Sequence, residues 1–247
     1  MDDATHHHTS AFIRKLEKVA PLTPDEKAAL LRLPVRVHTV AAHEDLAREG
    51  DTSSECFLIV EGFACRCTFT SEGKRQILSF HISGDMPDLQ SLYLGVMDHS
   101  LGTLVPSKLV FMQQGDLRTF MHRHPRLGDL LWHDTLIEAA VYRQWIVGLG
   151  RRSAQSRIAH LLCELLVRLR AVELVGDHTF TLPLTQTELG DALGLSTTHV
   201  DGTLQDLSGN GLISLHSDCL KVLNWEELQK VGDFDPTYLH LKNRNAF

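Results

Sequence analysis

The sequence predicts an α+β chain, in which a β-rich N-terminal domain is followed by a long helix and a C-terminal winged helix-turn-helix. Three observations predict this fold class. Short β-rich runs alternate with turn signals between Val35 and Met112, and helical periodicity dominates from Gly115 to about Val175. The segment Thr185–Leu223 then has the spacing of a helix-turn-helix followed by a hairpin. With 247 residues, the chain is long enough for two modest domains.

The composition excludes several classes of protein. Hydrophobic residues make up 43% of the chain and charged residues 22%, which is typical of a globular protein. No apolar run reaches the roughly 18–20 residues that a membrane span needs, and the polar, acidic N-terminus does not have the pattern of a secretory signal. The five cysteines are scattered and form no C-x-x-C motif, which favours a reduced cytoplasmic protein without a metal site. The net charge of −7 does not by itself indicate a nucleic-acid partner.

The β-rich region predicts a small sandwich or barrel. Turn-forming triplets such as Glu49-Gly50-Asp51 separate its runs. Cys65 and Cys67 alternate with other residues and share one strand face, where core packing is favoured over a metal or redox site. We expect strands at 35–40, 56–60, 63–70, 75–81, 103–105 and 108–113.

A long helix is expected after this region. Asp116–His122 forms a short helix, and Pro125 then opens a run to about Val147, which at about 1.5 Å per residue is about 33 Å long. A heptad seam on such a helix predicts a coiled-coil dimer contact; the alternative is packing on its own domain. The two heptad series are Leu130, Ile137, Gln144 and His133, Ala140, Val147.

Gly148-Leu149-Gly150 is predicted to break this helix, so Gly148 and Gly150 are the candidate hinge. A second helix, from about Ser153 to Ala171, has leucines at core spacing. The predicted domains are therefore a sensor domain with its long helix at 1–147, a hinge at 148–152 and a DNA-binding domain with a C-terminal tail at 153–247.

The helix-turn-helix is predicted from caps and small residues. Thr185 and Glu188 fit a capping box, Gly190 is small where the second helix must cross, and Gly194 permits the left-handed turn that ends the first helix. Ser196 then caps a second helix. The inward residues of that helix are Val200, Leu204 and Leu207, and a wing is predicted from 212–215 and 220–223, joined by 216–219.

Such a motif places the N-terminal part of its second helix in the major groove of DNA. The charge is unusual for that role, because the segment 184–224 holds one basic residue, Lys221, against five acidic residues. Neutral donors can still contact phosphates. The candidate DNA-binding residues are Arg151, Arg152, Gln186, Ser196, Thr197, Thr198, His199, Asp201 and Gln205.

The chain resembles the Crp–Fnr superfamily of bacterial regulators over about residues 11–241, and especially a branch common in alpha-proteobacteria. The resemblance implies a cyclic-nucleotide-binding-like β-roll, a long dimerisation helix and a winged helix, working as a homodimer on palindromic double-stranded DNA, with RNA polymerase as a further partner. The segments that carry it are Phe57–Gly62, Ile82–Asp85 with Asp88-Leu89, Trp145–Arg152, Leu184–Asp206 and Phe234–Leu239.

The effector site departs from the family pattern. Nucleotide-binding members hold the cyclic phosphate with a Gly-Glu-Leu turn and an Arg-Ser or Arg-Ala pair, where this chain has Pro87-Asp88-Leu89 and His99-Ser100. Pro87 has no N–H to donate, and a neutral His99 replaces a bidentate guanidinium poorly. Neither a cyclic nucleotide nor, without cysteines before Cys56, an iron–sulfur cluster is expected, so no cofactor is predicted and the effector is unknown. The candidate pocket residues are Asp85, Asp88, Leu89, His99 and Ser100.

The second departure is on the recognition helix, where relatives of this branch read His-Val-Asn-Arg and this chain reads His199-Val200-Asp201-Gly202. The leading hypothesis is a homodimeric DNA-binding regulator not controlled by cAMP. The alternative is a regulator with weakened DNA binding that acts through protein contacts or heterodimerisation. An enzyme is not expected, because no nucleophile motif or metal-ligand spacing accompanies Asp98 and His99, and no catalytic residue is predicted.

Overall fold

The computed structural model describes residues 10–241. Its contacts divide the chain into two compact units, Met1–Thr68 with Ser79–Glu138 and Phe69–Leu78 with Ala139–Phe247. The division falls inside the long helix and not at the predicted hinge, and the second unit includes the tip of a β-hairpin that belongs in sequence to the β-rich region. Within residues 10–241, no helix is both long and apolar enough to cross a membrane.

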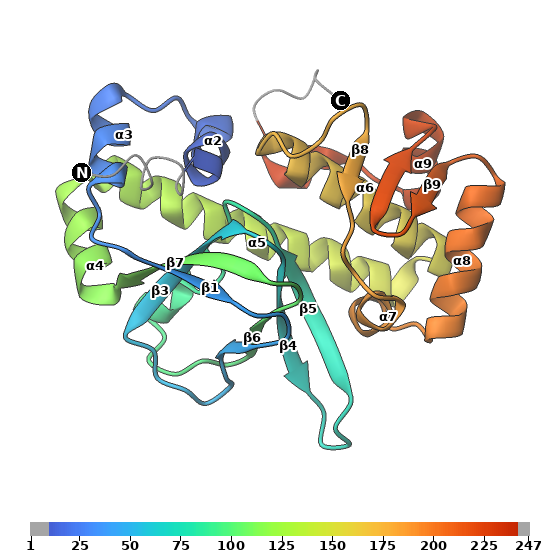
Figure 1. Cartoon of the computed structure of the whole chain (residues 1–247), viewed down its shortest axis with the longest axis horizontal. Helices are drawn as coiled ribbons and strands as arrows, with labels where there is room; N and C mark the ends of the chain where they lie inside the picture. The colour runs from blue at the N-terminus through green and yellow to red at the C-terminus, as the bar shows by residue number, and fades with distance from the viewer. Residues whose placement is uncertain (1–9, 242–247) are drawn as a thin grey trace. The chain divides into compact units, whose positions relative to one another are not determined.

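The first unit is built on two antiparallel sheets (Figure 1). One has the strand order β1-β7-β3 and the other β2-β6-β4-β5. Val110 of β7 lies opposite both Val37 and Leu58, so β7 is the central strand of its sheet. The strands are β1 (Arg36–Val40), β2 (Asp45–Ala47), β3 (Glu55–Glu61), β4 (Ala64–Phe69), β5 (Arg75–His81), β6 (Ser100–Thr103) and β7 (Ser107–Gln113).

Two of the strand predictions need correction. β2 was not predicted, because its three residues pair with β6 through a register shift and leave no alternating pattern. The strand expected at 103–105 lies earlier, at Ser100–Thr103, where Leu101 is buried and pairs with Arg66. The other strands of both sheets lie close to the predicted runs.

Helices close one side of the first sheet. These are α2 (Ser10–Val19), α3 (Pro24–Leu31), the 3₁₀ helix η1 (Leu89–Leu92), α4 (Gln114–Arg123) and the first half of α5 (Pro125–Arg151). Phe12 and Leu16 of α2 pack with Leu58 of β3, Phe120 of α4 and Leu131 of α5 in one apolar core. The amphipathic spacing of these helices thus buries one face of each against the sheet.

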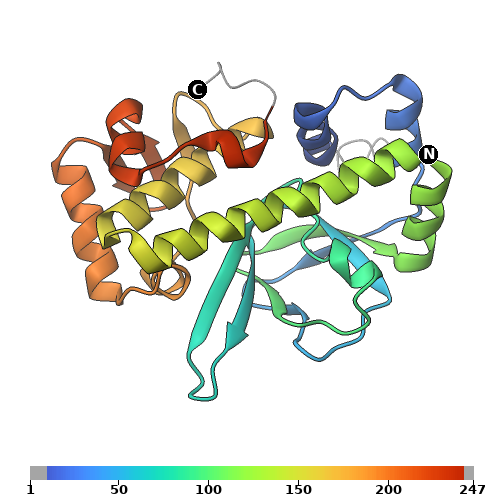
Figure 2. The ribbon, with the colours of Figure 1, turned by 180° about the vertical axis from the view of Figure 1, so that it is seen from behind.

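The helix α5 runs without interruption for 27 residues, through both glycines that were predicted to break it (Figure 2). The hydrogen bond from the Arg152 N–H to the Gly148 carbonyl continues the helical ladder at 3.1 Å. A glycine costs a helix only about 1 kcal/mol, which the neighbouring packing offsets. The prediction of a helix break at Gly148 and Gly150 is therefore wrong, and the chain turns instead at Arg152 and Ser153, where Ser153 caps α6 (Ala154–Ala171).

The predicted heptad seam on α5 is only partly exposed. Leu130 and Ala140 are buried within the chain's own fold, whereas Val147 is 43% exposed. The most exposed apolar side chains of α5 are Leu136 and Ile146, at 66% and 67%, and each lies one residue before a member of the predicted seam. Apolar residues therefore occupy both the inner and the outer face of α5, and the predicted dimer contact stays a prediction.

The second unit is mainly helical, with a small sheet of order β8-β10-β9. Its strand β8 was not predicted, because only three residues form it, and Phe180 of β8 pairs with Leu220 of β10. The remaining elements are β8 (Thr179–Thr181), α7 (Gln186–Leu193), α8 (Thr197–Gly209), β9 (Ile213–His216), β10 (Cys219–Val222), α9 (Trp225–Gly232) and the 3₁₀ helix η2 (Pro236–Leu239).

A buried carboxylate ties three parts of the second unit together. Glu164 of α6 is fully buried and accepts hydrogen bonds from Trp145 Nε1 of α5 at 3.2 Å and from the Tyr238 hydroxyl of η2 at 2.8 Å. Arg168 donates to its other oxygen at 3.1 Å. Burial, together with the negative charge of Glu164, raises the pKa of Tyr238, which keeps this hydroxyl protonated as a donor.

Candidate nucleic-acid interface

The first helix of the motif, α7, begins as predicted. The Glu188 N–H donates to Thr185 Oγ1 at 3.2 Å, and the Thr185 N–H donates to Glu188 Oε2 at 2.7 Å. This reciprocal pair satisfies two backbone donors that the first turn would leave open. The capping box that the sequence predicts is confirmed.

The turn between the two helices depends on two glycines. Gly194 has φ +64° and ψ 41°, a left-handed conformation that glycine adopts without strain. At Gly190, a Cβ would lie 2.6 Å from the carbonyl oxygen of Leu195, so only a hydrogen atom fits where the turn crosses α7. Both predicted roles are confirmed.

The second helix, α8, is capped by Ser196, whose Oγ accepts the His199 N–H at 3.2 Å. Its predicted inward residues Val200, Leu204 and Leu207 are buried. The opposite face is open, with Thr197, Thr198, His199, Gly202 and Gln205 exposed and Asp201 half-buried.

Asp201 lies at the centre of a hydrogen-bond network on this outer face. Its Oδ1 accepts from Gln186 Nε2 at 2.8 Å, and its Oδ2 accepts from Gln205 Nε2 at 3.0 Å. Three residues predicted separately as DNA contacts are thereby brought together, one from the first turn of α7 and two from α8.

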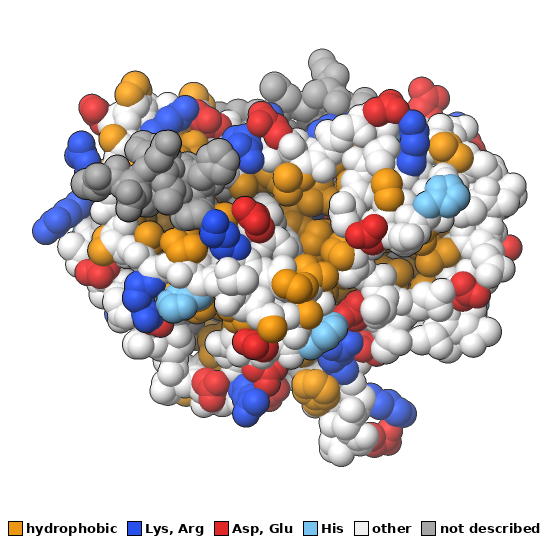
Figure 3. All heavy atoms as spheres, in the orientation of Figure 1, with side chains coloured by type: hydrophobic (Ala, Val, Ile, Leu, Met, Phe, Trp, Pro, Cys, Tyr) orange, Lys and Arg blue, Asp and Glu red, His pale blue; other side chains and the backbone are white. Residues whose placement is uncertain are grey.

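The wing is the hairpin of β9 and β10. Leu215 pairs with Leu220, and His216 pairs with Cys219, so the turn consists of Ser217 and Asp218 and is shorter than predicted. Lys221, the basic residue of this segment, lies 2.6 Å from Asp177 Oδ2 in an exposed ion pair. Over α8, Figure 3 shows red and uncoloured side chains and no blue, as the sequence indicates.

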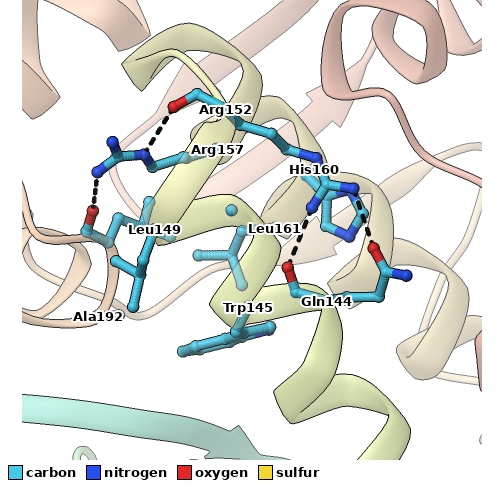
Figure 4. Close-up of a pocket in the computed structure, with 10 residues that line it drawn as sticks. Gln144, Trp145, Leu149, Arg152, Arg157, His160, Leu161 and Ala192 are labelled. Carbon is cyan, nitrogen blue, oxygen red and sulfur yellow. Dashed lines mark hydrogen bonds between the residues drawn. The ribbon is translucent and has the colours of Figure 1, made fainter.

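The predicted arginines at the start of α6 differ in accessibility. Arg151 is exposed. The side chain of Arg152 is only 7% exposed and donates to both the backbone and the side-chain oxygen of Gln144, at 3.1 and 2.9 Å (Figure 4). Arg152 contacts Asp233 as well, at 3.3 Å, so it can reach a phosphate only by giving up these bonds.

Arg157 of α6 donates to the carbonyl oxygens of Arg152 and Leu193, at 3.0 and 2.8 Å. Figure 4 shows Arg152 and Arg157 beside a pocket that Trp145 and Leu161 also line. Both arginines therefore hold the junction of α5, α6 and α7 together. The sequence gives no signal for the contacts with Leu193 and Asp233, because these partners lie 36 and 81 residues away along the chain.

The predicted effector residues occupy different environments in the first unit. Asp85 accepts from Lys15 at 2.7 Å and from the Ile82 N–H at 2.8 Å. Leu89 is part of the apolar core. Ser100 Oγ accepts the Glu49 N–H at 3.1 Å. Neither Leu89 nor Ser100 belongs to the polar cluster around Arg66.

Arg66, which sequence reasoning missed, is the central cation of that polar cluster. It is buried on β4, donates to the Pro87 carbonyl oxygen and lies 3.5 Å from Glu138 Oε2 of α5. Burial lowers the pKa of His99, and the charge of Arg66 acts in the same direction. The sequence carries no clear signal for it, because Arg66 alternates with Cys65 and Cys67, which is the pattern of a strand with one face in solvent.

Asp88 is the most strongly perturbed of the predicted pocket residues. Burial raises its pKa to about 8, although the Phe57 N–H and Arg66 act in the opposite direction. Burial raises the pKa of Glu138 to about 7 as well. At neutral pH burial therefore favours the protonated form of Asp88, whereas Glu138, beside the Arg66 guanidinium, is only about half protonated.

The raised pKa of Asp88 predicts how the free energy of unfolding depends on pH. The pKa of Asp88 is about 8 in the folded chain and near 3.8 in an exposed aspartate, so its contribution to stability is complete below about pH 4 and is lost as the pH rises to about 8. We expect the free energy of unfolding to fall with a slope of up to about 1.4 kcal/mol per pH unit from this residue, and Asp88→Asn to flatten the decline. Urea unfolding between about pH 5 and 8.5 measures it, with Asp129→Asn, exposed on α5, as the control. Equal slopes in all three proteins would contradict the prediction.

Within residues 10–241, no group of three or more His, Cys, Asp or Glu side chains is placed to hold a metal ion. Two family models match the chain. Residues 37–124 match the cyclic nucleotide-binding domain, and residues 156–231 match the Crp-like helix-turn-helix domain.

Named relatives match most of the chain. The Transcriptional activator protein FnrL of Cereibacter sphaeroides is 27% identical over 193 residues, which is 77% of each chain. The Nitrogen fixation regulation protein FixK of Bradyrhizobium diazoefficiens is 25% identical over 85% of this chain and 87% of its own. Among solved structures, FixK2 from Bradyrhizobium japonicum superposes with a TM-score of 0.74 and 22% identity, covering 81% of this chain and 98% of that one.

The cyclic nucleotide-binding domain and the helix-turn-helix domain follow each other along the chain in the order that the sequence predicts. The relatives named above are transcription regulators. The chain belongs to the Crp–Fnr superfamily of DNA-binding transcription regulators.

Proposed function

We propose that the chain acts as a homodimer on a palindromic DNA site, with α8 of each protomer in the major groove. The observation that carries the DNA half of the proposal is the complete motif, in which the caps, both glycines and the wing have the geometry that this recognition requires. Chemically, the interface relies on polar groups such as Ser196 and Thr198 for its phosphate contacts, because its basic side chains are few.

The homodimer rests on the exposed stripe of α5. Leu136, Ala139, Arg143 and Ile146 alternate at spacings of three and four residues, which is the pattern of a helix that packs along a second helix. Two large apolar side chains on one helix, each about two-thirds exposed, are unusual on a surface that stays in water. A second copy of the chain would cover both.

We also propose that cAMP does not control the protein and that it works without a metal or other cofactor. The Pro87 carbonyl is already bound to Arg66, and the guanidinium lies against Glu138, so the chain's own groups pair where a cyclic phosphate would need donors. A cytoplasmic location and contact with RNA polymerase belong to the same proposal. The relatives give no support to the alternative of a regulator without DNA binding.

The test uses Leu136→Asp with Ile146→Asp in the full-length protein. We expect the wild type to sediment as a dimer and to retain DNA at low salt, with binding that weakens as salt is added. The double variant should sediment as a monomer and lose most DNA retention, because two like charges would face each other across the stripe at each position. Leu174→Asp is the control, since this leucine is 47% exposed outside α5 and should change neither property.

Analytical ultracentrifugation and mobility-shift assays give the two readouts. A wild type that retains no DNA, even at low salt, would overturn the DNA-binding proposal. A double variant that remains dimeric would overturn the assignment of the interface while leaving DNA binding intact.

A further inference from the structure

The network around Asp201 is the feature of α8 that the family fold does not explain. Its two carboxylate oxygens accept from the amides of Gln186 and Gln205, at 2.8 and 3.0 Å. The inference below rests on the proposed DNA-binding function and concerns which bases the motif reads.

The network determines how both glutamine amides are turned. A carboxylate can only accept hydrogen bonds, so the NH₂ end of each amide faces Asp201 and the carbonyl oxygen of each points elsewhere. Each NH₂ group donates one of its two hydrogens to Asp201. Gln205 therefore keeps a carbonyl oxygen that can accept and a second N–H that can donate, both in the plane of its amide.

The surrounding surface leaves Asp201 accessible to a base. Thr198, Asp201, Gly202 and Gln205 are spaced at three and four residues and share the outward face of α8. A Cβ at Gly202 would meet nothing within 4 Å, so the space next to Asp201 on this side of the helix is open. The helix contains no lysine or arginine between Thr197 and Gly209, and so lacks the side chains that most often read guanine.

The base edges of the major groove differ in what they offer. Cytosine presents its N4 amino group and adenine its N6 amino group, both of which donate, whereas guanine presents the acceptors O6 and N7 and thymine presents O4 and a methyl group. A carboxylate gains a hydrogen bond from an amino group and is repelled by an acceptor. Asp201 can therefore discriminate between these two kinds of base.

We propose that Asp201 is a specificity-determining residue, which selects a cytosine or adenine through the exocyclic amino group of the base and also holds Gln205 in the orientation that matches adenine. Gln205 then presents its carbonyl oxygen to N6 and its remaining N–H to N7 of an adenine at a neighbouring position. Gln186, from the first turn of α7, supports the carboxylate from the other side.

The test begins with selection of bound sequences from a random duplex library by three full-length proteins. These are the wild type, Asp201→Ala and Asp206→Ala. Asp206 is the control, because it is exposed on the same helix and its variant makes the same change in charge, but Asp206 does not take part in the glutamine network. We expect Asp201→Ala to alter the preference at one or two positions of each half-site, and Asp206→Ala to select the wild-type sequence.

The second step identifies the chemical group that is read. In the selected operator, each adenine or cytosine at the altered positions is replaced by purine or 2-pyrimidinone, which lack the exocyclic amino group. We expect one such replacement to weaken wild-type binding by about tenfold, and to weaken Asp206→Ala equally. Binding by Asp201→Ala should change less than about twofold, because alanine has no acceptor for the amino group.

The outcomes separate this inference from the function on which it rests. Equal penalties for wild type and Asp201→Ala, or identical selected sequences for Asp201→Ala and Asp206→Ala, would overturn the assignment of Asp201 while DNA binding stands. If the wild type enriches no sequence, the proposed function fails and the inference fails with it. Circular dichroism melting checks that the two variants fold alike.

Discussion

Replacing Glu164 by alanine should lower the free energy of unfolding by about 3–5 kcal/mol, because it removes the acceptor of a buried ion pair. Three donors would lose this acceptor at once: Trp145 Nε1, the Arg168 guanidinium and the Tyr238 hydroxyl, which also lies 3.1 Å from His160 Nε2. A buried donor without an acceptor costs its full desolvation penalty, so the loss exceeds that of three ordinary hydrogen bonds.

Glu164→Gln separates the contributions of charge and of hydrogen bonding. A glutamine carbonyl can still accept from Trp145 and Tyr238, while its amide opposes Arg168, so we expect a smaller loss than for alanine. Urea unfolding followed by tryptophan fluorescence measures both variants. If Glu164→Ala unfolds at nearly the wild-type midpoint, the three contacts do not hold α5, α6 and η2 together.

Gly190→Ala should destabilise the helix-turn-helix by about 1–3 kcal/mol and abolish DNA retention. The added Cβ would lie 2.6 Å from the backbone oxygen of Leu195, and this oxygen belongs to the turn, so α8 must move away from α7. The same shift would separate Gln186 from Asp201, and with them the surface that faces DNA.

Gly202→Ala is the matched control in the same motif. A Cβ there meets nothing within 4 Å, and alanine favours a helix by about 1 kcal/mol over glycine, so this variant should be more stable than the wild type. Thermal unfolding of both variants gives the comparison. Shifts of the same sign at the two glycines would show that the crossing at Gly190 is not close.

The features that the sequence predicts well are those whose partners lie within a few residues. The capping box joins Thr185 to Glu188, and the Ser196 cap reaches only to His199. Gly194 is recognisable because a left-handed residue must follow the end of α7. Because the residues that make each of these contacts lie close together in the chain, a short stretch of sequence is enough to predict it.

The features that the sequence misses depend on partners brought together by folding. Arg66 contacts the Pro87 carbonyl and Glu138, which lies 72 residues away. Arg152 is positive and lies beside the motif, yet Gln144 and Asp233 bury its guanidinium. Charge alone cannot distinguish an arginine that contacts DNA from one that joins two helices.

The long helix illustrates a third kind of error. Gly148 and Gly150 weaken a helix by an amount that tertiary packing easily offsets, so a weak local preference was overridden. The most exposed apolar residues of α5, Leu136 and Ile146, lie one residue before members of the predicted seam for a related reason. Where apolar residues occupy two faces of a helix, periodicity establishes that a stripe exists but does not show which face the rest of the fold covers.

The open space at Gly202 has a consequence for how this regulator can diverge. A Cβ at that position meets nothing within 4 Å, and most residues other than proline favour a helix more than glycine does. A gene duplicate could therefore acquire a new set of promoters through a single codon change, with no loss of fold on the way. Selection on gene control would then act at Gly202 independently of selection on folding.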